Sequence, residues 1–235
     1  MILAGHQPEY LSYIGFFSKV CKADMFALVD HVQFEKKDWQ NRNRIRVITG
    51  ELMMTVPVKT KGKFTQAIKD VEINNDVPWA RKHWRSISLA YKDAPYFKEY
   101  KGFFEDTYHK KWNMLTDLDE HITLYMLDVF DINIPTKRTS EYGDIPGKKT
   151  DMIINMCKEF NADAYLSGAG GRDYVEVERF TANNMKHYFI DFKHPQYPQQ
   201  FKPFIPCMSA IDMLFNCGPE ESIRMIRESG GLVDE

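Results

Sequence analysis

The sequence predicts an α/β fold in which a mostly parallel sheet has helices on both faces and a helical insertion interrupts the core. Short apolar strands alternate with amphipathic helices near both ends of the chain, a pattern typical of parallel crossovers. Between them, residues 78–131 carry apolar side chains at helical spacing. We therefore expect an α/β core built from residues 1–77 and 132–235, with a helical insertion or subdomain over 78–131.

The first region reads as strand, helix, strand and then a further strand. Apolar strands are predicted at Ile2–Ala4, Phe26–Val29 and Leu52–Val58, and Pro57 favours an edge or end position for the last of them. Strand, helix and strand in this order predict a right-handed parallel crossover. The helix is marked by apolar side chains three and four residues apart, namely Tyr10, Ile14, Phe17, Val20 and Cys21.

The middle region is predicted to be helical. Asp76 can cap a helix that carries Pro78 in its first turn, and Ala94-Pro95 ends that helix. A second helical run extends from Tyr100 to Phe130. We expect these helices to cover one side of a cleft.

After Ile134-Pro135 the chain returns to alternating helices and strands. Together with the first region, this part predicts a Rossmann-like sheet, which binds ligands beyond the carboxyl ends of its strands. The predicted elements are a helix at 150–160, a strand at 164–166, a helix at 175–183, a strand at 187–192, and late helices around 212–215 and at 219–228.

The composition indicates a folded, cytoplasmic protein. An apolar share of 43% with 16 Phe, 12 Tyr and 4 Trp is ample for a buried core. The 31 basic and 33 acidic residues give no basic excess, which disfavours nucleic acid as a partner. We expect no signal peptide, because the N-terminus lacks a basic region followed by an apolar stretch of the required length. We also expect no association with a membrane, because no apolar run approaches roughly 20 residues. Free thiols are expected at Cys21, Cys157, Cys207 and Cys217, which form no Cys-x-x-Cys pair.

Three polar clusters follow predicted strands and should meet at the ligand-binding edge. They are Gly5-His6-Gln7, residues 30–34 and residues 167–172. A histidine can simply satisfy a loop, but the glycine before His6 and the strand that aims it at this edge favour a functional role. We predict that His6 stabilises charge on transferred phosphoryl oxygens. The predicted catalytic residues are His6, Asp30 and Arg172.

The loop Ser167-Gly168-Ala169-Gly170-Gly171-Arg172 is rich in glycine and ends in a cation. Small residues let backbone amides face an anion, and arginine can bind phosphate through two hydrogen bonds. A tight strand-to-helix turn is the alternative, and the loop matches neither the Walker pattern nor the dinucleotide fingerprint. Phosphate binding is predicted for Gly5, Ser167, Gly168, Gly170 and Gly171.

Residues 36–46 place five cations and three amides around Trp39. A solvated charge run usually lacks such amides and an aromatic ring, whereas RNA could stack on Trp39. Because no wider basic face accompanies the segment, we favour a nucleotide or sugar nucleotide. No spacing of His, Asp and Glu indicates a metal site, so Mg²⁺ would arrive with a nucleotide. The predicted substrate-binding residues are Gln7, Gln33, Trp39, Asn41, Arg42 and Arg44.

Several of these motifs resemble those of the WbqC-like family. The matching residues are His6-Gln7-Pro8-x-Tyr10-Leu11, Gly15-Phe16-Phe17, Asp30-x-Val32-Gln33-Phe34, Trp39-Gln40-Asn41-Arg42-Asn43, Val56-Pro57-Val58 and Tyr165-Leu166-Ser167-Gly168. The resemblance implies a role near bacterial surface-polysaccharide and O-antigen synthesis, often in gene sets that make amide-bearing amino sugars. It implies no catalytic roles.

The layout is also distantly similar to nucleotidylyl transferases with a His-x-Gly-His signature, such as pantothenate synthetase. A strand leads into a histidine loop, a helix has a glycine near its start, and the next strand ends in Asp30. Only His6 matches the signature, because other residues stand where its second histidine would be. The similarity therefore implies a shared fold more strongly than adenylation.

These observations predict an enzyme of surface-polysaccharide precursor synthesis, either a transferase or an AMP-forming amide ligase. It would attach an acyl or aminoacyl group, such as glycyl, to the amine of a nucleotide-linked amino sugar. ATP with Mg²⁺ is the predicted cofactor, and the amino sugar and a small amino acid or acyl donor are the predicted partners. The alternatives are a nucleotidylyl transferase acting on a sugar phosphate and a non-catalytic protein that binds a sugar nucleotide or RNA.

Overall fold

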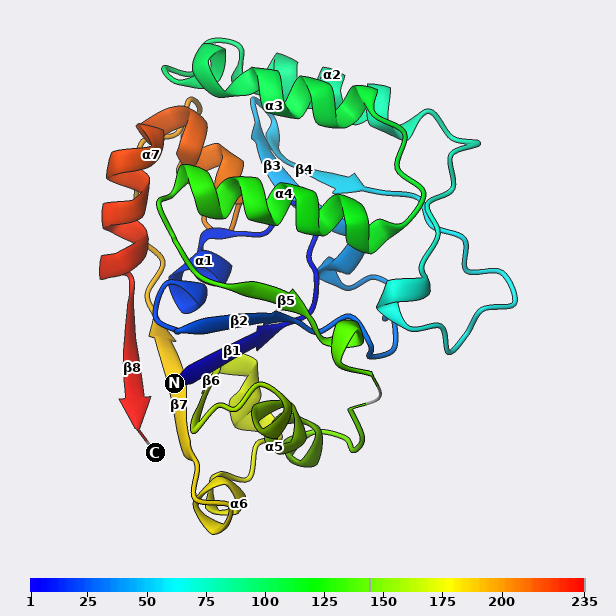
Figure 1. Cartoon of the computed structure of the whole chain (residues 1–235). Coiled ribbons are helices and arrows are strands. Elements are labelled where there is room, and N and C mark those ends of the chain that lie inside the picture. The colour runs from blue at the N-terminus through cyan, green and yellow to red at the C-terminus, as the bar shows by residue number, and fades with distance from the viewer. Residues whose placement is uncertain (144, 235) are drawn as a thin grey trace.

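A computed structural model describes residues 1–143 and 145–234, and a six-stranded sheet lies at the centre of this part of the chain (Figure 1). Its strands are β1 (Ile2–His6), β2 (Met25–Leu28), β5 (Thr136–Arg138), β6 (Ala164–Ser167), β7 (Lys186–Phe192) and β8 (Gly230–Asp234). Their spatial order is β5-β2-β1-β6-β7-β8. Neighbouring strands are parallel except β7 and β8, which are antiparallel. The predicted α/β fold with a mostly parallel sheet is confirmed.

Helices cover both faces of this sheet, as predicted. On one face lie α5 (Thr150–Glu159) and α6 (Val177–Ala182), and on the other lie α1 (Ile14–Val20) and α7 (Ala210–Glu228) (Figure 1). Successive residues of a strand point to opposite faces, so Leu3 enters one buried cluster and Ala4 the other. Burial on both faces explains why β1 is an unbroken apolar run in the sequence.

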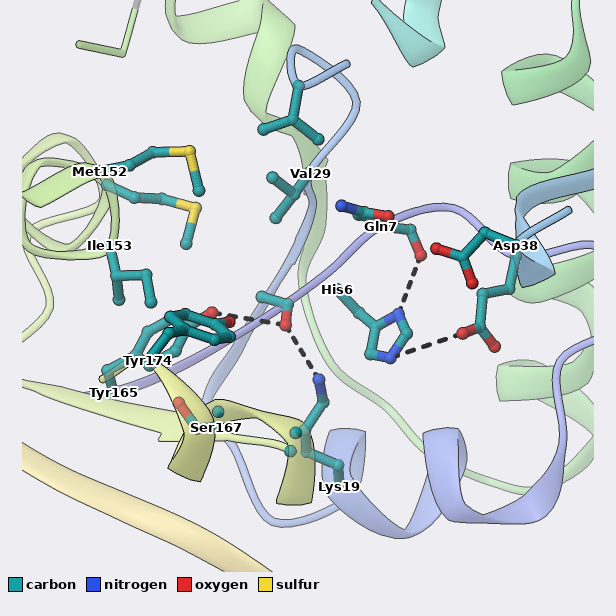
Figure 2. A pocket seen from close by; sticks show the side chains of 17 residues that line it. His6, Gln7, Lys19, Val29, Asp38, Met152, Ile153, Tyr165, Ser167 and Tyr174 are labelled. Carbon is teal, nitrogen blue, oxygen red and sulfur yellow. Dashed lines mark hydrogen bonds and ion pairs between the residues drawn. The ribbon is translucent and has the colours of Figure 1, made fainter. Parts of the chain in front are cut away.

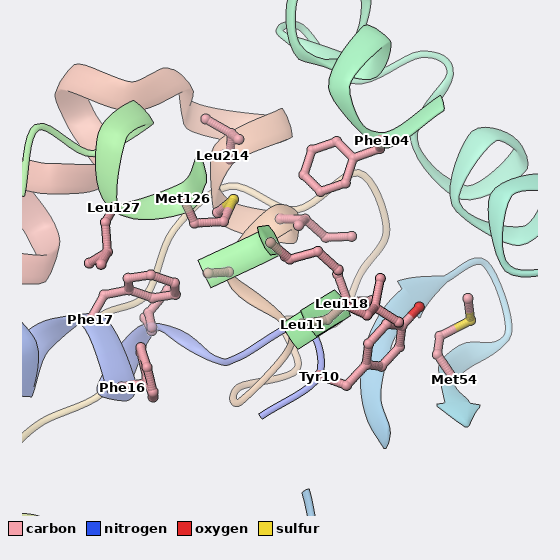
Figure 3. Close-up of a cluster of buried hydrophobic side chains, with 14 of the residues drawn as sticks. Tyr10, Leu11, Phe16, Phe17, Met54, Phe104, Leu118, Met126, Leu127 and Leu214 are labelled. Carbon is pink, nitrogen blue, oxygen red and sulfur yellow. The ribbon is translucent and has the colours of Figure 1, made fainter. Parts of the chain in front are cut away.

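The middle of the chain forms three helices, α2 (Trp79–Tyr91), α3 (Phe97–His109) and α4 (Leu115–Val129). The predicted long helical run is therefore broken between α3 and α4. Asp76 does not cap α2, because Pro78 occupies the N-cap position and no side chain bonds there. The three helices share one buried cluster with α1 and α7 (Figure 3), in which the rings of Phe104 and Phe215 lie 5.4 Å apart.

A two-stranded antiparallel sheet lies outside the central one. It consists of β3 (Arg42–Val47) and β4 (Gly50–Thr55). The sequence did not predict β3, because its cations and amides resemble a polar loop. The predicted strand at 52–58 is β4, which begins two residues earlier and ends at Thr55, before Pro57.

The part of the chain after α4 differs from the prediction in two respects. The two late helices are one kinked element, α7, in which Gly218 has φ 76° and Pro219 follows. The short edge strands β5 and β8 were also missed, because they are brief and polar or glycine-rich. Within the described ranges, no helix combines the length and apolar character that a membrane span requires.

Candidate functional site

A cavity of about 320 Å³ opens at the carboxyl ends of β1 and β6 (Figure 2). The segment after β1, helices α1 and α5, the segment after β2 and the glycine-rich loop after β6 contribute to its wall. The first and third predicted clusters therefore lie together. The lining residues are Gly5, His6, Gln7, Glu9, Lys19, Val29, Val32, Asp38, Met152, Ile153, Met156, Tyr165, Ser167, Gly168, Gly170, Gly171 and Tyr174.

His6 is the last residue of β1 and projects into this cavity. Its Nδ1 atom lies 2.9 Å from the carbonyl oxygen of Gln7, so Nδ1 carries the ring proton and Nε2 is left as an acceptor. The imidazole edge packs on the ring of Phe16, with 5.0 Å between centroids. Burial, aided by the positive charge of Lys19, lowers the pKa of His6 to about 3. The imidazole is therefore neutral at pH 7.

Glu9 is a buried acid on the same wall. Its Oε1 atom lies 3.7 Å from Nε2 of His6, and its Oε2 atom has no hydrogen-bond partner. Burial raises the pKa of Glu9 to about 8; Lys19 opposes this rise and Asp38 adds to it. Sequence reasoning missed this residue, although the spacing of His6 and Glu9 was a signal that could have found it.

Lys19 supplies a cation from the last turn of α1. Only 3% of the residue is exposed, and its Nζ atom donates a hydrogen bond of 2.9 Å to the carbonyl oxygen of Gly5. Burial lowers the pKa of Lys19 to about 7, with Glu9 opposing the shift. Sequence reasoning missed this lysine too. Its signal was a lone charge among the apolar residues of a helix that is buried along its whole length.

The glycines of the site differ in whether the surrounding packing leaves room for a side chain. A Cβ atom at Gly5 would lie 2.7 Å from the hydroxyl of Tyr165, and one at Gly171 would lie 2.8 Å from Cβ of Ser167. Both positions therefore need glycine for close packing. A Cβ atom at Gly168 or Gly170 would meet open space.

The Ser167 hydroxyl lies 2.9 Å from Nε2 of the buried His187.

Comparison with known proteins identifies the relatives of the chain. The model of the WbqC-like protein family matches residues 7–224. The chain belongs to this family. An uncharacterized protein of Mycobacterium tuberculosis is 30% identical over 216 residues, which cover 91% of this chain and 93% of that protein. No solved structure matches. Nothing in these comparisons supports the distant similarity to nucleotidylyl transferases.

Two predicted catalytic residues of this WbqC-like protein lie outside the cavity wall. Asp30 is fully buried, and its carboxylate accepts hydrogen bonds from the Ser140 amide (2.9 Å), the Ser140 hydroxyl (2.7 Å) and the Thr139 hydroxyl (3.1 Å). It therefore anchors the turn after β5. The guanidinium of Arg172 lies over the ring of Phe189, 4.4 Å from its centroid. The geometry supports a structural role for Asp30 and does not bring Arg172 to His6.

Three of the six predicted substrate-binding residues line a cavity. Gln7 lines the first cavity, where its Oε1 accepts a hydrogen bond of 2.6 Å from Gln40. Asn41 and Arg42 line a second cavity of about 270 Å³ beside the β3–β4 hairpin. The remaining residues of that cavity are Phe34, Lys36, Lys37, Thr55, Val56, Pro57, Val58 and Thr60.

The other predicted ligand contacts line neither cavity. Gln33 is exposed and donates to the carbonyl oxygen of Phe64 at 3.4 Å. Arg44 lies 5.4 Å from the ring centroid of Trp39 and forms a 3.0 Å ion pair with Glu51. Among residues 1–143 and 145–234, no cluster of three or more His, Cys, Asp or Glu is placed to hold a metal ion.

Proposed function

We propose that this protein transfers an acyl or aminoacyl group to the amine of a nucleotide-linked amino sugar, in the synthesis of a bacterial surface polysaccharide. One observation carries the proposal. His6, Glu9 and Lys19 share a cavity at the carboxyl ends of parallel strands, the edge at which α/β folds bind ligands. Membership of the WbqC-like family supports the polysaccharide context.

The side chains suit amide formation. The amine nitrogen attacks the acyl carbon, the leaving group departs, and the nitrogen loses one proton. Nε2 of His6, the ring nitrogen that carries no proton, can accept a hydrogen bond from the attacking amine and so orient it. Lys19 is the cation that would stabilise negative charge on the acyl oxygen or on a leaving phosphate.

The size of the cavity restricts what it would hold. Its volume of about 320 Å³ lies at the lower end of the range for ligand pockets, which is roughly 300–1,000 Å³. The sugar and the reacting group would fit there, and the nucleotide would extend outside. Asp38 lines this cavity and its neighbour Lys37 lines the second one, together with Lys36 and Arg42. These cations suit the diphosphate of the substrate.

In the ATP-dependent version that we favour, ATP activates the acyl donor. The donor's carboxylate attacks the α-phosphorus of ATP, which gives an acyl-adenylate and pyrophosphate. The sugar amine then attacks the acyl carbon and releases AMP. Mg²⁺ would enter with the nucleotide, since a nucleotide-bound magnesium ion needs few protein ligands.

Product analysis by mass spectrometry tests the proposal. The protein is incubated with a UDP- or dTDP-linked amino sugar, glycine, ATP and Mg²⁺, and in parallel with acyl-coenzyme A donors. We expect the nucleotide sugar to gain one acyl or glycyl group. His6→Ala should abolish this product, whereas the exposed His109→Ala should not. Pyrophosphate without amide would indicate nucleotidylyl transfer. Binding without any product would indicate a binding protein.

A further inference from the structure

The carboxyl group of Glu9 faces the cavity without satisfying its hydrogen-bonding capacity. The side chain is nine-tenths buried, and Oε2 has no partner. Its other oxygen, Oε1, has only the 3.7 Å contact with His6, which is longer than a hydrogen bond. An unpaired buried carboxyl is unfavourable, and a ligand that brings a donor would relieve this cost.

A second carboxyl group, that of Asp38, lies on the same cavity wall. Asp38 is half-buried, and one of its oxygens accepts a hydrogen bond of 2.8 Å from the Trp39 amide. The effect of Asp38 on the pKa of Glu9 indicates that the two acids are close enough to repel each other. In Figure 2, Asp38 and Lys19 lie on different sides of His6.

Lys19 influences Glu9 through its charge but makes no hydrogen bond or ion pair with it. Lys19 donates to the Gly5 carbonyl oxygen rather than to Glu9. Within the described part of the chain, no lysine or arginine forms an ion pair with Glu9 or Asp38. The cavity therefore offers the unpartnered carboxyl oxygen of Glu9 and the carboxyl of Asp38 to a ligand that brings N–H donors, and positive charge on that ligand favours the ionised form of Glu9.

We propose that Glu9 and Asp38 form a subsite for the primary amine of the substrate and so make the protein selective for a free amino sugar over its N-acetyl form. The inference rests on the proposed function and adds the residues that recognise the amine. An ammonium group has three donors and a full charge, which suit two carboxyl groups. An acetamido group has one N–H, no charge and more bulk, so it can pair with at most one of the two acids.

Matched nucleotide sugars test the subsite by isothermal titration calorimetry. The probes are UDP-glucosamine with UDP-N-acetylglucosamine, and dTDP-4-amino-4,6-dideoxyglucose with its 4-acetamido form. In at least one pair the free amine should bind the wild-type protein at least tenfold more tightly. Glu9→Gln and Asp38→Asn should each reduce this preference, and the double variant should abolish it.

The controls separate the possible results. Glu35→Gln changes an exposed acid of the same segment that does not line the cavity, and it should leave the preference intact. Thermal unfolding checks that each variant is folded, and the half-buried Asp38 remains testable if Glu9→Gln is unstable. Equal binding within both pairs, or a preference that survives in the folded double variant, would overturn the subsite alone. Failure of all four probes to bind would overturn the proposed function and the subsite with it.

Discussion

The Nζ atom of Lys19 lies 2.9 Å from the carbonyl oxygen of Gly5, which joins the end of helix α1 to the central strand β1. The two residues are 14 positions apart in the chain. Their contact places a buried cation directly beside His6, the residue that follows Gly5. The parallel crossover from β1 through α1 thus assembles part of the site within the first 20 residues.

Replacing Lys19 should weaken the binding of an anionic substrate. Lys19→Met keeps the length of the side chain but removes the only lysine or arginine on the described wall of the first cavity. We expect the affinity for the nucleotide sugar to fall at least tenfold, as for the loss of a charge-assisted contact of about 1.4 kcal/mol. Lys22→Met, at a position outside the cavity, is the control. Titration calorimetry measures both, and unchanged binding by Lys19→Met would show that the ligand does not use this cation.

The raised pKa of Glu9 makes a prediction for stability against pH. A carboxyl group with a folded pKa of about 8 and an ordinary unfolded value near 4.5 binds its proton more tightly in the folded protein. This contribution to stability is complete below about pH 4.5 and is lost as the pH rises to about 8. A glutamine does not titrate, so Glu9→Gln does not suffer this loss. Its free energy of unfolding should therefore rise relative to that of wild type between pH 5 and pH 8, by on the order of 2 kcal/mol.

Urea denaturation of both proteins at pH 5, 6.5 and 8 measures this difference. Groups that titrate identically in both proteins cancel in this comparison. Lys19 does not cancel fully, because the charge of Glu9 affects its pKa. Glu35→Gln is again the control, and it should give no such trend. A difference between Glu9→Gln and wild type that stays constant with pH would mean that Glu9 is ionised in the folded protein at neutral pH.

The glycine-rich loop provides matched variants with opposite expectations. Gly171→Ala places a methyl group 2.8 Å from Cβ of Ser167 and 3.3 Å from the ring of Phe189, so η4 (Ala169–Asp173) must shift away from β6. We expect a loss of about 1–3 kcal/mol in the free energy of unfolding. Gly170→Ala meets no atom within 4 Å and should change stability by less than about 0.5 kcal/mol. Equal effects on the thermal midpoint would contradict the packing argument.

Local pattern in the sequence predicted two of the segments that line the first cavity. His6 and the loop at 167–172 each follow a short apolar strand, and parallel strands deliver their ends to one edge. Lys19 and Glu9 carried only weak local signals, because a charged residue is normally exposed and tertiary packing buries these two. Asp30 shows a different limit of the local pattern. Its position at the end of a strand suggested a ligand contact, but the distant Ser140 uses its carboxylate.

The strands that were missed also have a physical explanation. β5 is a three-residue polar segment at one edge of the sheet, and β8 is a glycine-rich segment at the other edge. An edge strand is formed by pairing with a partner distant in sequence, so its own residues need not show an apolar pattern. β3 reads as a basic polar segment for a different reason: it pairs along its whole length with the neighbouring β4, and polar residues such as Asn43 and Arg46 occupy buried positions in it.

Two arginines that the sequence linked to phosphate should behave differently. Arg42 lines the second cavity beside Lys36 and Lys37, whereas Arg172 lies over Phe189 and lines neither cavity. We expect Arg42→Ala to weaken nucleotide-sugar binding by about five- to tenfold, because it removes one contact to the diphosphate. Arg172→Ala should change the affinity less than twofold. Because phosphate contacts of this kind are screened by salt, the defect of Arg42→Ala should shrink between 50 and 500 mM NaCl. Titration of UDP-glucosamine at both salt concentrations measures these effects. A larger loss of affinity for Arg172→Ala than for Arg42→Ala would indicate that the phosphates bind at the glycine-rich loop.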